Sequence, residues 1–399
     1  MKSSSSSDIL RFPKMILLML ICSVANFLGT LLSPALPALT KAFQVTPSVA
    51  AITMSIFLIG YCIGQLPYGP IGNRFGRKKA FYIGMAIALC GNLLGYFADT
   101  FPVLCFARFL QAVGASAGLV SAFTIIGDLH AGPAAKKSLA TMSFAFGIIP
   151  GLATTIGGFV TVFAGWQSCF LVLSVYIVIL WFFARKLPET APHLHFEALK
   201  FRSVIEGYYS QFKNPHMVFC ALQAGLTTAS MYIFITLAPY IGINQIGLLP
   251  DTYGLLGILP SAGLFTGALI SRALSEKDPR IAPALGIFLF IFAASGFTYF
   301  FARSEVTVWT LFVPAIFMYM GNNLIWSNAL AQGQSRSDDK SNASAVLQFI
   351  NLAVATVGVF VVQALPSTNP MTMPFVFWII AALSLILMIK LKAFRKHPG

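Results

Sequence analysis

Charged residues are scarce in this chain. Only 10% of its 399 residues are Asp, Glu, Lys or Arg, whereas about 25% is usual for a soluble domain. Hydrophobic residues make up 57%, and they recur in blocks near the roughly 20 residues that a helix needs to cross a bilayer. So few charges could not cover so large an apolar interior in water. The composition therefore excludes a soluble protein and predicts a membrane protein.

Paired cysteines and strong metal patterns are also missing. The six cysteines contain no C-x-x-C pair, and they lie in or beside apolar blocks, where a thiol packs as a small apolar group. The five histidines lie in or beside polar connectors, and the H-x-H at His193 and His195 is a weak metal pattern. We therefore expect no metal and no cofactor.

Twelve apolar blocks predict an all-α membrane protein of twelve transmembrane helices. They lie at about 15–36, 48–68, 80–98, 103–125, 138–162, 168–185, 217–238, 252–272, 282–302, 307–329, 342–364 and 374–393. The longest connector divides them into two six-helix pseudo-repeat bundles, at 15–185 and 217–393. The remaining segments are a tail at 1–14, a linker at 186–216 and a tail at 394–399. Apolar residues at helical spacing predict an amphipathic helix within the linker, lying on the membrane surface.

Basic residues predict the orientation of the helices. Only Lys41, Arg108 and Arg303 among the 26 Lys and Arg lie outside the segments that an alternating path places on one side. Cytoplasmic loops carry such an excess of Lys and Arg, so we expect both termini in the cytoplasm. The net charge of +14 then reports topology, and we expect no nucleic-acid partner.

A short pattern repeats between the two halves. Gly69 and Arg74 after the second block correspond to Gly267 and Arg272 after the eighth. Parallel repeats of this kind build transporters whose substrate site lies at mid-membrane between the halves. The repeat predicts such a site here.

Four motifs resemble those of a known family. The loop from Gly69 to Lys79 resembles the cytoplasmic loop signature of the major facilitator superfamily, and Arg108 to Ala115 resembles the fourth-helix motif of its drug/proton antiporters. Pro150 to Gly158 resembles their antiporter motif, and Leu187 to Thr190 also fits. Together they resemble the Bcr/CflA branch of multidrug efflux proteins. The resemblance implies a monomeric transporter in a bacterial inner membrane, with a small organic substrate and a proton as a possible coupling ion.

The resemblance assigns roles to two groups of residues. It implies a conformational latch between the halves, formed by Gly69, Asn73, Arg74, Gly76 and Arg77. The family has an acid where this chain has Asn73, so the latch is expected to be weaker or differently partnered. A helix-bend motif is expected at Pro150, Gly151, Gly157 and Gly158. Ala153 and Thr154 replace the usual Gly-Pro pair, which weakens the case for strict antiport.

Arg108 is the one charge well inside a predicted span. A buried Arg costs about 2.5–3.5 kcal/mol on insertion scales, so we expect a role in substrate binding or coupling. The alternative is an Arg that binds backbone carbonyls and packs the first and fourth spans together. No acid lies mid-membrane, and Thr30 stands where the branch has an Asp. Proton coupling would therefore need an edge acid such as Asp128, or the substrate's own protons.

Polar residues within the spans complete the expected cavity and leave three functions open. With Arg108, we expect it to be lined by Gln111, Thr30, Asn26, Gln223, Asn322 and Asn351. The first function is export of small organic molecules, either drugs or a metabolite. The second is transport of an anionic metabolite such as a polycarboxylate siderophore, outward or inward, favoured by a lone cavity Arg. A membrane-embedded enzyme is the remote third, because Asp338 and Asp339 are the only adjacent acids.

Overall fold

The computed structural model describes residues 12–129, 132–191, 209, 211–274, 278, 280–335, 340–365 and 369–396. These ranges are helical and contain no strand. The first half holds α1 (Phe12–Cys22), α2 (Val24–Thr30), η1 (Ser33–Ala35), α3 (Leu36–Ala42), α4 (Pro47–Phe75), α5 (Arg77–Tyr96), α6 (Phe101–Leu129) and α7 (Gly132–Ala184). The second holds α9 (Pro215–Pro239), η3 (Tyr240–Gln245), α10 (Pro250–Leu256), α11 (Ile258–Ala273), α12 (Ile281–Ala302), α13 (Val308–Ser335), α14 (Lys340–Gln363) and α15 (Thr372–Lys396). The helical class predicted from the composition is confirmed.

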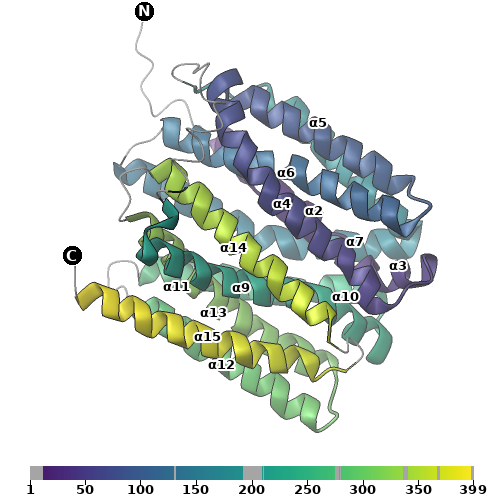
Figure 1. The fold of residues 1–399 in the computed structure, drawn as a ribbon. Coiled ribbons are helices and arrows are strands. Elements are labelled where there is room, and N and C mark those ends of the chain that lie inside the picture. The colour runs from purple at the N-terminus through teal and green to yellow at the C-terminus, as the bar shows by residue number, and fades with distance from the viewer. Residues whose placement is uncertain are drawn as a thin grey trace, which may run out of the picture.

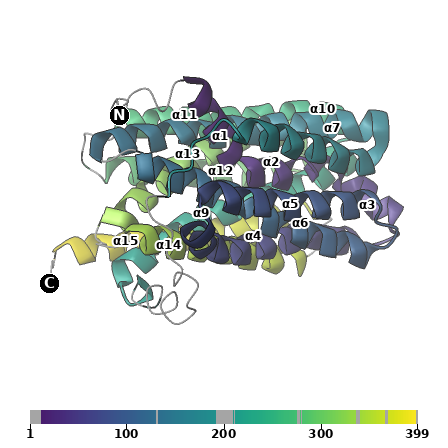
Figure 2. The same ribbon diagram turned by 90° about the horizontal axis from the view of Figure 1, so that it is seen from above.

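The long helices run side by side in two groups (Figure 1). In the first group α6 packs against α4 and α5, and in the second α13 packs against α9, α11 and α12. The groups meet along two seams, where α7 contacts α10 and α11 and where α4 contacts α14. Figure 2 shows these seams on opposite long sides of the molecule. The space between the seams is where the two groups face each other.

The first apolar block is broken rather than continuous. The segments Met15–Cys22 and Val24–Ala42 meet at an angle of 45°. Ser23 lies between them, and its hydroxyl donates a hydrogen bond of 3.0 Å to the carbonyl of Leu20. A Ser hydroxyl that bonds to a preceding carbonyl competes with the helix ladder and bends the helix. The block at 15–36 was predicted as one span, and the structure adds a bend within it.

The long helix α7 contains two helices joined at Gly165. There the backbone takes φ 80° and ψ 164°, a conformation that glycine adopts without a steric penalty. The position agrees with the predicted boundary between the blocks at 138–162 and 168–185. Pro150 lies inside the first of these helices.

Ten helices in the described part of the chain are long and apolar enough to cross a membrane, or eleven if the bent pair forms one span. One of the ten, Phe144–Ala184, has 41 residues, about twice the length that one crossing needs. The amphipathic helix predicted within 186–216 lies largely outside the described residues. The boundaries of the predicted domains therefore remain predictions.

Candidate functional site

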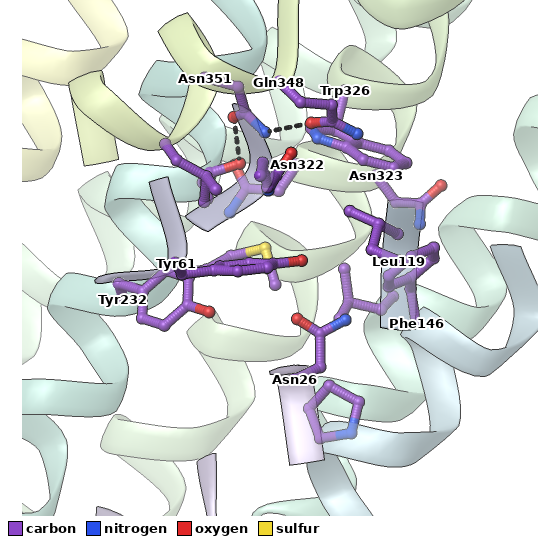
Figure 3. Close-up of a pocket in the computed structure, with 16 residues that line it drawn as sticks. Asn26, Tyr61, Leu119, Phe146, Tyr232, Asn322, Asn323, Trp326, Gln348 and Asn351 are labelled. Carbon is purple, nitrogen blue, oxygen red and sulfur yellow. Dashed lines mark hydrogen bonds between the residues drawn. The ribbon is translucent and has the colours of Figure 1, made fainter. Parts of the chain in front are cut away.

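A cavity of about 100 Å³ lies between the two groups of helices (Figure 3). Both groups contribute to its wall, through α2, α4, α6 and α7 on one side and α9, α11, α13 and α14 on the other. It is lined by Asn26, Tyr61, Gln65, Leu119, Phe146, Pro150, Thr228, Met231, Tyr232, Leu264, Asn322, Asn323, Trp326, Gln348, Asn351 and Leu352. This is the place between the halves that the repeat predicted.

Amide and hydroxyl groups form one part of the wall. Asn351 donates to the Oε1 atom of Gln348 at 2.9 Å and accepts from the hydroxyl of Thr228 at 2.7 Å. Asn322 donates to the hydroxyl of Ser230 at 2.9 Å. Its own Oδ1 atom and the Nε2 atom of Gln65 are buried without a hydrogen-bond partner. An acceptor and a donor are therefore free for a ligand.

Aromatic side chains form another part of the wall. Phe146 of α7 and Trp326 of α13 meet edge to face, with ring centroids 5.9 Å apart. Figure 3 shows Tyr61 and Tyr232 lying together, with Asn26 on the side away from Asn351. Broad aromatic faces bring a large apolar contact area. The cavity is suited to an amphipathic organic molecule.

Charge is absent from the wall as the structure describes it. None of the sixteen lining residues is Asp, Glu, Lys, Arg or His. A charged ligand in an apolar interior needs an opposite charge or several hydrogen bonds to replace its lost hydration. The composition of the wall therefore favours uncharged ligands.

Arg108 lies behind this wall, in the packing between helices. Its side chain is 0% exposed, and its Nη1 atom donates to the carbonyl of Leu28 at 3.0 Å and to the side chain of Gln111. Gln111 in turn donates to Asn92. The guanidinium carbon lies 4.3 Å from the ring centre of Phe57, a cation–π contact. This geometry matches the packing alternative considered for Arg108.

The predicted cavity residues divide into three sets. Asn26, Asn322 and Asn351 line the cavity, whereas Arg108, Gln111 and Thr30 are not among its lining residues. The Thr30 hydroxyl instead donates to the carbonyl of Asn26 at 2.7 Å. Gln223 lines a separate cavity.

Other lining residues were not among the predicted site residues, although helical spacing relates some of them to one another. Tyr61 lies four residues before Gln65, and Thr228 lies four before Tyr232. Residues at this spacing share one face of a helix. That spacing is the signal that could have found Tyr61 and Thr228.

The predicted latch residues form a network around the turn between α4 and α5. Gly76 takes φ 101°, and Glu189 accepts hydrogen bonds from the backbone N–H groups of Arg77 at 2.8 Å and Lys78 at 3.1 Å. The Nε atom of Arg77 lies 3.0 Å from Asp128, and its Nη1 atom donates to Asn73. Arg74 lies over the ring of its neighbour Phe75, and a Cβ atom at Gly69 would meet nothing within 4 Å. Asn73 and Asp128 belong to the first half and Glu189 to the segment that follows α7, so in this conformation the network ties α4, α5 and α6 to that segment.

The predicted helix-bend residues lie where α7 approaches its neighbours most closely. A Cβ atom at Gly157 would lie 1.8 Å from the carbonyl oxygen of Leu31, and one at Gly158 would lie 2.2 Å from that of Pro250. Gly151 lies against Ser261 of α11, and Pro150 lines the cavity. The motif therefore permits backbone contact at the seam between the two groups.

Hydrogen bonds close one end of the space between the groups. Ser33 donates to the carbonyl of Ile235 at 2.8 Å, and the hydroxyls of Thr40 and Tyr240 lie 3.2 Å apart. The side chain of Gln363 donates to Ser55 at 2.7 Å and to the carbonyl of Ala51 at 2.8 Å. We refer to these contacts of Ser33, Thr40, Ser55, Tyr240 and Gln363 as the closed end.

Comparisons with known proteins agree with this architecture. Residues 18–362 match the Major Facilitator Superfamily. The chain is 26% identical to multidrug resistance protein D of Escherichia coli K12 over 317 residues, 78% of each chain. It is 26% identical to chloramphenicol resistance protein CraA of Acinetobacter baumannii, over 65% of this chain and 62% of that one.

Two further comparisons concern coverage and fold. At 29% identity, the chain spans 63% of the length of an uncharacterized transporter of Rickettsia bellii. A solved bacterial homologue of the human lysosomal transporter Spinster superposes over the whole of both chains with a TM-score of 0.76, at 14% identity. This likeness concerns the fold alone.

Proposed function

Because the chain belongs to the Major Facilitator Superfamily, and is thus a membrane transporter and not an enzyme, we propose that it exports small uncharged organic molecules. The cavity between the helix groups is the proposed substrate site. The observation that carries this proposal is a wall of amides, hydroxyls and aromatic rings without a charged side chain among its lining residues.

The energetics of the wall support an uncharged substrate. Leaving a buried donor or acceptor unpaired costs about 1–3 kcal/mol, and both Asn322 Oδ1 and Gln65 Nε2 are in that condition. A substrate that carries an amide or hydroxyl group would relieve both costs. A permanent cation or anion would lose its hydration with no opposite charge in return. The names of the relatives, which refer to multidrug and chloramphenicol resistance, support export of drug-like compounds.

The anionic-metabolite alternative depended on an Arg in the cavity. Arg108 here binds Leu28, Gln111 and the ring of Phe57. Its Nε atom has no hydrogen-bond partner, but the residue is 0% exposed and outside the cavity lining, so an anion in the cavity does not reach the guanidinium in this conformation. The uncharged class is therefore the better supported of the two.

We propose twelve spans in two six-helix bundles, with both termini in the cytoplasm. The bent pair at Met15–Ala42 counted as one crossing, and Phe144–Ala184 counted as two, bring the candidate spans to twelve. The asymmetry of Lys and Arg supports the orientation. In that orientation the closed end faces away from the cytoplasm.

Flux into proteoliposomes tests the proposal. Chloramphenicol serves as the uncharged probe, citrate as the polyanion and tetraphenylphosphonium as the permanent cation. We expect saturable flux of chloramphenicol and none of the other two probes. In Asn322→Leu the chloramphenicol flux should fall at least tenfold, because two methyl groups replace the polar atoms of the amide.

The matched control is Asn328→Leu, because Asn328 lies on the same helix as Asn322 but outside the cavity. It should transport like the unaltered protein. Citrate flux that exceeds chloramphenicol flux would replace the proposal with the anionic alternative. Flux of tetraphenylphosphonium at the chloramphenicol rate would contradict the uncharged class altogether.

A further inference from the structure

A second cavity lies within the second group of helices. It encloses about 270 Å³ and shares no residue with the cavity between the groups. Residues of α9, α12, α13 and α15 line it, together with Arg280 just before α12. These helices pack in a ring, α9 against α13, α13 against α12, α12 against α15 and α15 against α9. Its lining residues lie near the start of α9 and α12 and near the end of α13 and α15, so the cavity is at one end of the ring.

Gln223 is a polar group in this cavity that lacks a partner. Its side chain lines the cavity and the residue is only 4% exposed. Both its Oε1 and its Nε2 atoms are buried without a hydrogen bond. Native interiors pair such groups with protein or with a bound molecule. The amide is therefore placed to donate to and accept from an occupant.

The cavity has room for more than water. One water molecule takes up about 30 Å³ in the liquid, far less than the volume of this cavity. Ala329 and Ile325 of α13 and Met388 of α15 contribute apolar wall. The occupant must therefore combine a polar group for Gln223 with apolar parts.

Positive charge lies at the mouth. Arg280 lines the cavity, and its side chain is 60% exposed. Its acid neighbour Asp278 is 3.8 Å away and also open to solvent, so the pair is weak. Lys390 of α15 follows the lining residue Ile389, and its ammonium lies 5.7 Å from the ring centre of Phe219. This charge favours an anionic group at the mouth.

The outer wall of the cavity faces the membrane. Ile389 lines the cavity and is also 59% exposed on α15. Phe288 and Phe292 of α12 and Ile386 of α15 are likewise exposed large hydrophobic residues. In a membrane protein such a surface contacts lipid chains. A molecule held in the cavity could leave its acyl chains on this surface.

We propose that this cavity binds an anionic phospholipid. The phosphate pairs with Arg280, and the glycerol ester region hydrogen-bonds to Gln223, which lies two turns inside α9. The order of groups matches that of a phospholipid, with the charge at the membrane surface and the ester oxygens deeper. Basic pockets between transmembrane helices on the cytoplasmic side recognise such headgroups. The site is separate from the proposed transport cavity, and its occupancy is measured without transport.

Native mass spectrometry of the purified full chain tests the proposal. The probes are phosphatidylglycerol and phosphatidylcholine with the same acyl chains, and glycerol 3-phosphate as the soluble anion. We expect retention of phosphatidylglycerol alone. Arg280→Gln should lower its retention about fivefold, the effect of one cation near an anionic surface, and Gln223→Leu should lower it by at least as much.

Arg303→Gln is the matched control, because Arg303 follows the opposite end of α12 and the charge change is the same. It should retain the lipid fully. Ala329→Phe fills the cavity with an apolar ring and should displace the lipid. The comparison of the two lipids in the unaltered protein does not depend on how any variant folds.

Three results would overturn the proposal. One is equal retention of phosphatidylcholine, which would indicate a non-specific apolar surface. Another is binding of glycerol 3-phosphate as tight as that of the lipid, which would indicate a soluble anion as the ligand. The third is undiminished retention of phosphatidylglycerol in both Gln223→Leu and Arg280→Gln.

Discussion

Arg108 holds a positive charge inside the helix bundle, and none of the described side chains that contact its guanidinium is an acid. The Leu28 carbonyl, the Gln111 amide oxygen and the Phe57 ring surround its guanidinium, and Met54 sulfur lies 3.9 Å away. Each of these groups is a dipole or a quadrupole whose negative end faces the cation. Together they also connect the helix that carries Arg108 to α2 and α4.

Replacement of Arg108 should affect stability before it affects selectivity. In Arg108→Gln the shorter side chain leaves the carbonyl of Leu28 unpaired, and charged hydrogen bonds contribute about 1.5–3 kcal/mol each. We expect the free energy of unfolding to fall by about 2 kcal/mol, seen as a lower melting temperature in detergent. The folded fraction should still transport chloramphenicol and not citrate, as we expect of the unaltered protein.

The same variant tests the substrate role predicted from the sequence. If Arg108→Gln melts at the same temperature as the unaltered protein but no longer transports, Arg108 has a role in substrate binding. Arg108→Lys provides the matched comparison, because it keeps the charge and loses the planar fork.

At the residue scale the sequence provided candidate polar residues but not the direction in which each side chain faces. Asn26, Asn322 and Asn351 were expected in the cavity because amides are costly within a membrane span. Arg108 and Gln111 satisfied the same criterion and lie in the packing between helices. The difference depends on the rotation of each helix about its axis. Packing against neighbours sets that rotation, and the pattern of one helix does not contain it.

Among the elements, α7 carries the closest contacts between the two halves. Gly158 lies against the backbone of α10 in the other half, and Gly157 lies against the backbone of the first apolar block in the same half. A side chain at either position would separate the helices. Thr155 adds a hydrogen bond of 3.0 Å to the carbonyl of Gly254. Small residues allow close helix packing in membranes. The role of these positions as a helix-bend motif stays a prediction, and the sequence did not name their neighbours.

A methyl group at Gly158 should open this seam. Gly158→Ala would place its Cβ atom 2.2 Å from the carbonyl oxygen of Pro250, so α7 must move away from α10. We expect fewer cross-links between cysteines introduced at Ser33 and Ile235, which touch in the closed end. Gly127→Ala is the control, because a Cβ atom there meets nothing within 4 Å. Equal cross-linking in both variants would show that the seam tolerates the methyl group.

The start of α5 depends on a carboxylate that is distant in the sequence. Glu189 accepts from the first two backbone N–H groups of this helix, which otherwise lack a partner within the helix. A negative charge at a helix N-terminus is stabilising. We expect Glu189→Ala to lower the free energy of unfolding by about 1–2 kcal/mol, measured by thermal melting.

Glu305→Ala serves as its control, because it removes the same charge from an exposed turn. A melting temperature that falls equally in both variants would attribute the effect to net charge instead of to the cap. The resemblance noted from the sequence implied a conformational latch that includes Gly69, Gly76 and Arg77. It could not predict that Glu189 completes the turn, because 112 residues separate Glu189 from Arg77.

At the scale of the whole molecule, the helices form two groups that touch along α7 and α4 and leave a cavity between them. Composition and block length were sufficient to predict an all-helical membrane protein, because a bilayer allows few alternatives to the helix. The break at Ser23 was not predicted, since it depends on one hydroxyl competing with the backbone. The conformation of the molecule, closed at one end, was also beyond the sequence, since alternating access uses the same residues in every state.

Gln363 contributes two hydrogen bonds to the closed end, one to Ser55 and one to the carbonyl of Ala51. Gln363→Leu keeps the size of the side chain and removes both bonds. Each is worth about 0.5–1.5 kcal/mol, so the balance between the closed and open arrangements should shift about tenfold or more towards the open one. A cysteine introduced at Asn26, in the cavity, should then react faster with a membrane-impermeant maleimide added outside intact cells. Gln167→Leu changes an exposed glutamine two residues after Gly165 and should leave the labelling rate unchanged. If Gln363→Leu instead raises labelling only in opened membranes, the closed end faces the cytoplasm, and the orientation inferred from Lys and Arg is reversed.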